Sequence, residues 1–245
     1  MDSALRLRID EGNRKAWDLM LSDPEAARGL VTGVLEEASR AGYALGQAEA
    51  HLNLGWCEHY LTHMVTAIDN FQKAQELYET LSDSIGLMKA YNALGVAHHD
   101  LGRYETAMDF YTRSLEEARR RGNALREAVT LNNIGEVCLD RGEIKEALDY
   151  FLRAYETIIE DEDPELVANV LINIGTSFQR MENWGLAKDF SEKALVITKG
   201  SGDHHLQAQA HLGLGRIERA SDNLRGAEAH YVEALRLTEA LKNGK

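Results

Sequence analysis

The chain has 245 residues, of which 44% are hydrophobic, and a formal net charge of −13. The hydrophobic content is ordinary for a folded protein, and the negative charge argues against nucleic acid or an anionic membrane as partner, because both are bound through positive charge. The charged N-terminus lacks a signal-peptide core, and no apolar run approaches a membrane span, so we expect a cytoplasmic protein.

The first predicted elements are two helices in residues 1–43, from about Ser3 to Met20 and from Pro24 to Arg40. They follow a 40-residue period that continues through the chain: Ala27 stands where later repeats carry alanine, although Lys15 stands where they carry glycine. Terminal repeats are commonly atypical and act as caps. We therefore expect residues 1–43 to form a degenerate N-terminal helix pair that caps the array.

Residues 44–245 are predicted to form five tandem repeats of 40 residues. Each repeat has a glycine at one fixed spacing and an alanine twelve residues after it: Gly55, Gly95, Gly135, Gly175 and Gly215, with Ala67, Ala107, Ala147, Ala187 and Ala227. This register predicts a stacked array in place of independent domains. Two apolar-periodic runs per repeat, separated by a turn of two or three residues, predict an antiparallel helix pair.

The start of the first helix in each repeat is marked by a capping residue. Asp83, Asn123, Asp163 and Asp203 stand twelve residues before their glycines, where their side chains can cap the helix. Pro164 fits the first helical position, and the acidic run at 160–163 is expected to be a loop before this cap. A glycine inside a helix costs about 1 kcal/mol relative to alanine, so we expect the repeated glycines to permit a close helix approach.

The order of side chains in each repeat resembles the tetratricopeptide repeat. Leu or Ile precedes the glycine of the first helix; the second helix carries the alanine, an aromatic residue and a second small residue. The aromatic residue is Phe71, Tyr111, Phe151 or Tyr231, and Ser191 is the exception. The longer second helix is similar to the repeats of kinesin light chains and of bacterial signalling proteins. The resemblance implies an all-α, right-handed superhelical solenoid that binds an extended peptide or a helix of a partner in a concave groove, without catalysis or cofactor.

On a helical wheel, one side of each first helix is mostly apolar or small, and the resemblance places the groove on the opposite side. In the last two repeats this opposite side carries Asn169, Ile172, Asn173, Thr176, Arg180, Gln209, Leu212, Gly213, Arg216 and Ala220. The candidate peptide-binding residues on that side are Asn53, Trp56, Tyr60, Lys89, Asn92, Asn132, Asn133, Glu136, Asn169, Asn173, Arg180 and Arg216. Asparagine can both donate to and accept from a peptide backbone; the alternative is that these are polar residues tolerated on a wet surface. Trp56 and Tyr60 either anchor apolar side chains or pack internally. The cations Lys89, Arg180 and Arg216 favour an acidic ligand segment.

Other constellations do not predict chemistry. The family pattern that clamps a terminal carboxylate is absent, because Leu52, Trp56 and Ala93 occupy its positions. The histidines His59, His63, His98 and His99 lack the companions of a zinc site, so we expect no metal. No phosphate loop, nucleophile elbow or other catalytic motif is present, so we expect no catalytic residues and no enzyme. Some similar bacterial proteins are aspartyl-phosphate phosphatases, but they carry a helical bundle that residues 1–43 are too short to supply.

Two alternatives to a free peptide-binding module remain open. The chain is the sensory or regulatory part of a longer bacterial signalling protein, such as a diguanylate cyclase or kinase, or it is a scaffold that self-associates to a homo-oligomer. Both follow from the last helix, where residues 233–241 carry an apolar stripe without a terminal cap. We expect a fragment of a longer protein, with a protein or peptide ligand, no nucleic acid and no membrane as partner.

Overall fold

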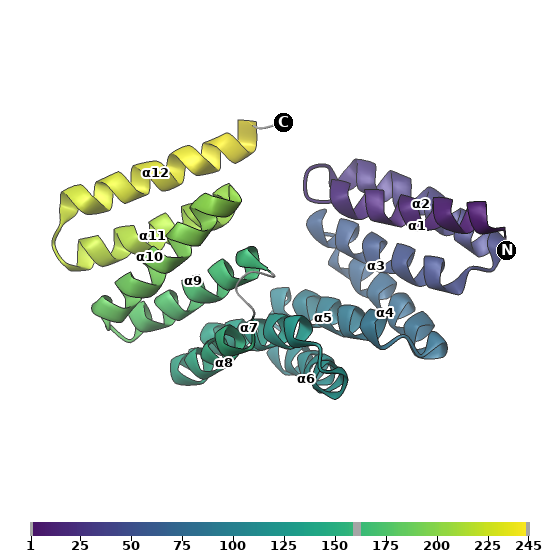
Figure 1. Ribbon diagram of the computed structural model, residues 1–245, viewed down its shortest axis with the longest axis horizontal. Coiled ribbons are helices and arrows are strands. Elements are labelled where there is room, and N and C mark those ends of the chain that lie inside the picture. The colour runs from purple at the N-terminus through teal and green to yellow at the C-terminus, as the bar shows by residue number, and fades with distance from the viewer. Residues whose placement is uncertain (1, 159–162, 244–245) are drawn as a thin grey trace. The chain divides into compact units, whose positions relative to one another are not determined.

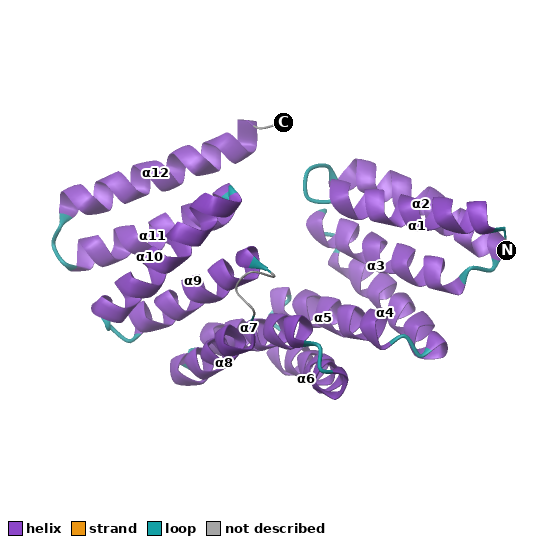
Figure 2. Ribbon diagram, in the orientation of Figure 1, coloured by secondary structure: helices purple, strands orange, loops and turns teal. Residues whose placement is uncertain are grey.

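The computed structural model describes residues 2–158 and 163–243, and these residues form an all-α fold without strands (Figures 1 and 2). The expected fold class is confirmed. The twelve helices in the described residues are α1 (Ser3–Leu19), α2 (Pro24–Ala41), α3 (Ala44–Tyr60), α4 (Met64–Leu81), α5 (Ser84–Asp100), α6 (Tyr104–Arg121), α7 (Ala124–Asp140), α8 (Ile144–Thr157), α9 (Pro164–Arg180), α10 (Trp184–Ser201), α11 (His204–Ala220) and α12 (Leu224–Asn243). Among these residues, no helix has the length and apolar character needed to cross a membrane.

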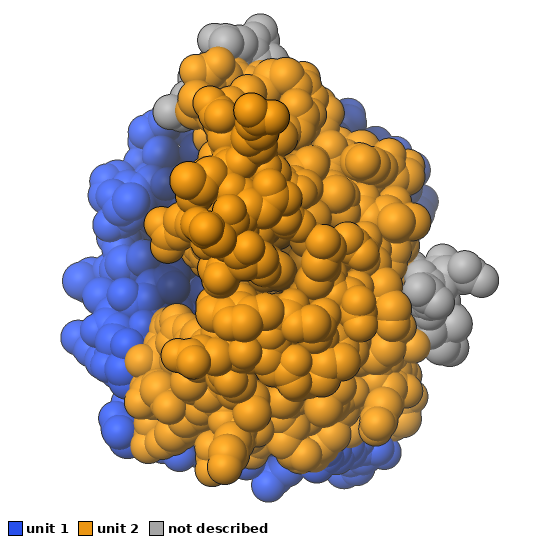
Figure 3. Space-filling view, turned by 90° about the vertical axis from the view of Figure 1, so that its left-hand side faces the viewer, with its two compact units in different colours: residues 1–121 blue, residues 122–245 orange. Residues whose placement is uncertain are grey.

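The helices group into two compact units, residues 1–121 with α1 to α6 and residues 122–245 with α7 to α12 (Figure 3). Each unit contains three antiparallel helix pairs. In unit 1 the first helices α1, α3 and α5 contact one another in succession, and in unit 2 α7, α9 and α11 do so. The second helices contact the first helix of the next pair and not one another within the described residues. The first helices therefore form one layer of each unit.

The predicted bounds of the first two helices are close to the observed ones. The expected N-terminal pair corresponds to α1 and α2, although its role as a cap stays a prediction. The four expected capping residues each accept hydrogen bonds from backbone N–H groups at their helix start: Asp83, Asn123, Asp163 and Asp203. Of the acidic run, residues 160–162 lie outside the described residues.

The repeated glycines contact aromatic rings. A Cβ atom added to Gly55 would lie 2.3 Å from Phe71, and one added to Gly95 would lie 2.4 Å from Tyr111. Phe71 and Tyr111 have no exposed surface. In these repeats the absent Cβ makes room for the ring of the second helix, and not for its backbone as the sequence suggested. The exception is Gly175, where Ser191 replaces the ring and a Cβ would lie 3.4 Å from the backbone oxygen of Ala187.

Candidate functional site

The groove-side residues of α7 and α9 form a hydrogen-bonded network in unit 2. The side-chain amide of Asn173 lies within donating distance of three oxygen atoms: Asn132 Oδ1 at 2.9 Å, Glu136 Oε1 at 3.0 Å and Asn169 Oδ1 at 3.1 Å. The amide of Asn132 also donates to Glu136 Oε1 at 3.0 Å. Four of the candidate residues are therefore brought together across two successive first helices.

Burial divides these four residues by role. Asn132 is 4% exposed, so its amide serves the contact between α7 and α9. Glu136, Asn169 and Asn173 are half-buried and retain surface on the first-helix layer. The neighbouring Asn133 is half-buried as well and has further interactions of its own. The network fixes the side chains that face outward, because a rotamer change would break a partly buried hydrogen bond.

In unit 1 the candidate Asn53 is directed into the fold. Asn53 is 6% exposed, and its amide donates to the backbone oxygen of Asn13 at 3.0 Å. Asn13 is equally buried and donates to the backbone oxygen of Gly46 at 3.1 Å. These bonds join α1 to α3, so the structure gives Asn53 an internal role in place of the expected groove position. Asn13 stands two residues before Lys15, as Asn53 stands before Gly55, and that register could have identified it.

The aromatic candidates of unit 1 pack internally to different extents. The ring of Trp56 meets that of Phe71 edge-on with centroids 5.2 Å apart, and Trp56 is half-buried. Tyr60 lies 6.3 Å from Trp56 and is 45% exposed. Of the two interpretations of Trp56, the observed contact favours internal packing, whereas Tyr60 retains an open surface.

The remaining candidates of unit 1 lie on α5. Lys89 and Asn92 are half-buried, and Asn92 has interactions of its own. Burial raises the pKa of Glu49 on α3, while the positive charge of Lys89 opposes that shift. Lys89 therefore acts electrostatically on a neighbouring acidic side chain.

The four histidines that were considered as metal ligands have separate partners. His59 Nε2 lies 2.6 Å from Asp100 Oδ2, and His63 Nδ1 lies 2.7 Å from Glu58 Oε2. The hydrogen bond from His59 lowers the pKa of Asp100. His98 stacks on Phe110 and His99 lies against Tyr104. Over residues 2–158 and 163–243, no three His, Cys, Asp or Glu side chains are arranged to hold a metal ion.

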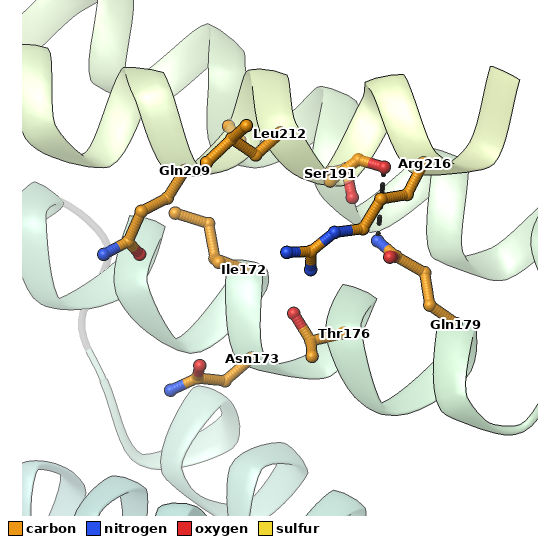
Figure 4. A pocket seen from close by; sticks show the side chains of 10 residues that line it. Ile172, Asn173, Thr176, Gln179, Ser191, Gln209, Leu212 and Arg216 are labelled. Atoms are coloured by element: carbon orange, nitrogen blue, oxygen red, sulfur yellow. Dashed lines mark hydrogen bonds between the residues drawn. The ribbon is translucent and has the colours of Figure 1, made fainter. Parts of the chain in front are cut away.

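A cavity lies between α9 and α11 on the groove side of unit 2 (Figure 4). Its volume is about 180 Å³, and seven of its ten lining residues stand at the positions assigned to the groove from sequence: Ile172, Asn173, Thr176, Gln209, Leu212, Gly213 and Arg216. Gln179, Ser191 and Ala210 complete it. A second, more open pocket of about 360 Å³ shares Thr176, Gln179 and Arg216 and adds Arg180, Trp184, Arg219 and Ala220.

The two arginine candidates of unit 2 differ in their contacts. Arg180 Nη1 donates to the backbone oxygen of Leu139 at 2.9 Å, which ties α9 to α7. Arg216 is exposed, and its guanidinium group points toward Thr176 and Ile172 (Figure 4). The sequence reasoning missed Gln179, Trp184 and Arg219. Gln179 and Arg219 stand four residues after Gly175 and Gly215, at a position that the wheel did not assign to the groove.

Comparisons with solved structures place this fold among known helical-repeat proteins. BtubC (BKLC) from P. vanneervenii is similar with a TM-score of 0.67 and 22% identity, over 98% of this chain and 93% of that one. The Rap conjugation gene regulator of the plasmid pLS20, solved in complex with the Phr* peptide, has a TM-score of 0.71 and 15% identity, over 93% and 72%. Aspartyl phosphate phosphatase F from Bacillus subtilis has a TM-score of 0.72 and 15% identity, over 96% and 71%.

A comparison with curated protein sequences finds no match. The profile of the tetratricopeptide repeat matches residues 86–159 and 166–240, which is more than half of the chain. These segments contain four of the five repeated glycines and most of the candidate residues. The chain therefore belongs to the tetratricopeptide repeat family.

Proposed function

We propose that the layer of first helices in unit 2 binds an extended peptide segment of a partner protein. The observation that carries this proposal is the cavity between α9 and α11, most of whose lining stands at the positions expected for the groove. Cavities with a few convergent polar groups are the usual form of a binding site. The residues proposed to contact the segment are Asn133, Glu136, Asn169, Asn173, Arg180 and Arg216.

The chemistry of this surface suits a peptide backbone. Asn169 and Gln209 occupy the same position on α9 and α11, and both side chains carry a donor and an acceptor. Leu212 is 40% exposed beside them and offers an apolar contact for a side chain. The similar Rap regulator was solved with the Phr* peptide, which supports a peptide as the class of ligand.

The proposed role is non-catalytic and needs no metal or cofactor. Burial raises the pKa of Cys57 and of Cys138 to about 11, so neither thiol is activated at neutral pH. Both cysteines are buried and free. Buried free thiols fit a reducing compartment, and we propose the cytoplasm as the site of action.

The test is selection from a library of short random peptides displayed on phage, with the full chain as bait. Selected peptides are then titrated against wild type and an Asn169→Ala/Gln209→Ala variant by fluorescence polarisation. Loss of two hydrogen-bonding side chains should weaken binding about tenfold or more. Gln72→Ala, which removes an exposed amide on α4, is the matched control and should bind as wild type does.

Thermal melting of each variant keeps this result interpretable, because titrations are made only where all three proteins are folded. Failure to enrich any peptide would contradict the proposal. So would a set of peptides that binds wild type and the double variant with the same affinity, since the site would then lie elsewhere.

A further inference from the structure

The cavity between α9 and α11 exists because one repeat departs from the pattern of the others. In the repeat of α7 and α8, the ring of Phe151 occupies the space over Gly135, where an added Cβ would lie 2.5 Å from the ring. The corresponding side chain over Gly175 is Ser191, which has no ring. Gly213 on α11 also leaves space, because a Cβ there would lie 3.2 Å from Gln179 Nε2 and 3.4 Å from Ser191 Oγ.

The polar side chains around this cavity are one guanidinium group, three amides and two hydroxyls. Arg216 extends its guanidinium group over it, and Thr176 and Gln179 lie beside it (Figure 4). Ser191 at its base is 3% exposed, and this residue completes the lining of the cavity. Guanidinium, amide and hydroxyl groups can all donate hydrogen bonds to a bound anion.

The charge around the cavity opposes that of the chain as a whole. The chain carries 40 acidic and 27 basic residues, yet no acidic side chain lines either pocket within the described residues. Arg216 and Arg219 form no ion pair there. Arg216 therefore lines both pockets, and Arg180 and Arg219 line the second one, without a carboxylate of the protein in either lining. Such a site attracts a carboxylate from a ligand.

We infer that the cavity between α9 and α11 is a subsite for one acidic side chain, glutamate or aspartate, of the bound peptide segment. The carboxylate would pair with the Arg216 guanidinium group, and Thr176, Gln179 and Ser191 would supply further hydrogen bonds. This inference rests on the proposed function, because it names the side chain that the segment places in the cavity. It gives the module a sequence preference that an asparagine surface alone would not supply.

The test uses capped amino acids as probes of the full chain. N-acetyl-glutamate N-methylamide has only a side-chain carboxylate, and N-acetyl-glutamine N-methylamide is its neutral isostere. N-acetyl-glycine has only a terminal carboxylate. The readout is the NMR shift of the Gln179 side-chain amide and of the Gly213 backbone amide. We expect the glutamate probe to give saturable shifts. The other two probes should bind with an affinity at least about tenfold lower.

Three variants locate the site. Arg216→Gln should lower the affinity for the glutamate probe about tenfold, because a charge-assisted hydrogen bond is lost. Arg225→Gln makes the same charge change at an exposed position outside both pockets and should leave binding unchanged. Ser191→Phe restores the aromatic residue found in the other repeats, fills the cavity and should abolish the shifts while the thermal melting temperature is kept or raised.

The outcomes separate this inference from the proposed function. Equal binding of the glutamate and glutamine probes, tighter binding of N-acetyl-glycine, or undiminished binding by a folded Ser191→Phe variant would overturn the subsite. If library peptides are captured but show no acidic preference, the peptide function stands and the subsite fails. If the glutamate probe binds as expected but no peptide is captured, the subsite stands as an anion site and the peptide function fails.

Discussion

The side-chain amide of Asn173 donates a 2.9 Å hydrogen bond to the side-chain oxygen of Asn132, across two successive first helices of unit 2. Unit 1 has a related contact, in which Asn53 donates to the backbone oxygen of Asn13 on the preceding first helix at 3.0 Å. Asparagines in the first helices therefore join neighbouring repeats. Where they also retain surface, as Asn173 does, the contact between repeats presents an ordered polar group to a ligand.

The Asn53→Ala variant tests the structural side of this arrangement. Asn53 is 6% exposed, so its removal loses a buried hydrogen bond between α3 and α1. We expect the free energy of unfolding to fall by about 1–2 kcal/mol, measured by urea titration. Gln72→Ala on the exposed side of α4 should change it by less than about 0.5 kcal/mol. Equal stability of the two variants would show that the Asn53 contact contributes nothing.

Two glycine-to-alanine variants separate steric from conformational effects. A Cβ at Gly95 would lie 2.4 Å from the ring of Tyr111, and the buried ring cannot move away without cost. Gly95→Ala should therefore destabilise the protein by about 1–3 kcal/mol. Gly29 also lies within a helix, α2, but has no heavy atom within 4 Å of an added Cβ, so Gly29→Ala should stabilise it by about 0.5–1 kcal/mol. Chemical unfolding measures the change in the free energy of unfolding for each variant. If this change has the same sign in both variants, the prediction is wrong.

Backbone strain at the turn between α3 and α4 predicts a stabilising substitution. Thr62 has a φ of 64°, in the left-handed region that a β-branched residue avoids; the corresponding residues Gly102 and Gly142 are glycines with φ of 68° and 81°. Thr62→Gly should raise the free energy of unfolding by about 1 kcal/mol. Thr66→Gly, inside α4, should lower it by a similar amount because glycine loses more entropy in a helix. A lower melting temperature for Thr62→Gly would show that the strain is absent.

The pair His211 and His230 predicts a pH dependence in the last helix pair. Their Nδ1 atoms lie 2.9 Å apart, and burial, followed by the neighbouring His230, lowers the pKa of His211. The charged groups Glu233, Lys199 and Arg236 also act on it, Glu233 raising the pKa and the two cations lowering it. The folded state therefore binds a proton on His211 more weakly than the unfolded state does. The stability that neutral His211 contributes to the fold is complete above the ordinary pKa of about 6.5 and is lost as the pH falls below that value.

We therefore expect wild-type stability to fall between pH 7 and pH 5 more steeply than that of His211→Leu. Leucine stands at the corresponding position of α7 and α9, as Leu131 and Leu171, so the variant should remain folded. Urea unfolding at several pH values measures the slope in each protein. His205→Leu, at an exposed position of α11, is the control and should keep the wild-type slope. Parallel slopes for wild type and His211→Leu would contradict the prediction.

The helix pairs could be predicted from sequence because their signals are local. Caps such as Asp83 and Asp163, and turns of two or three residues, depend on neighbours along the chain. Contacts between side chains of different repeats could not be predicted in this way. The sequence placed Asn53 in the groove, whereas the structure directs it toward α1, because helix rotation relative to a neighbouring repeat decides which side of Asn53 is covered.

The cavity likewise depends on tertiary structure and not on a local sequence signal. Ser191 was recognised from sequence only as an exception to an aromatic series, and nothing local indicated that its small side chain leaves about 180 Å³ open beneath Arg216. By itself, the sequence determined the family and the approximate helix boundaries, since periodicity and capping are properties of one segment. The tertiary structure decided which polar residues bind their neighbours and which face a ligand, because that depends on the approach of helices about forty residues apart.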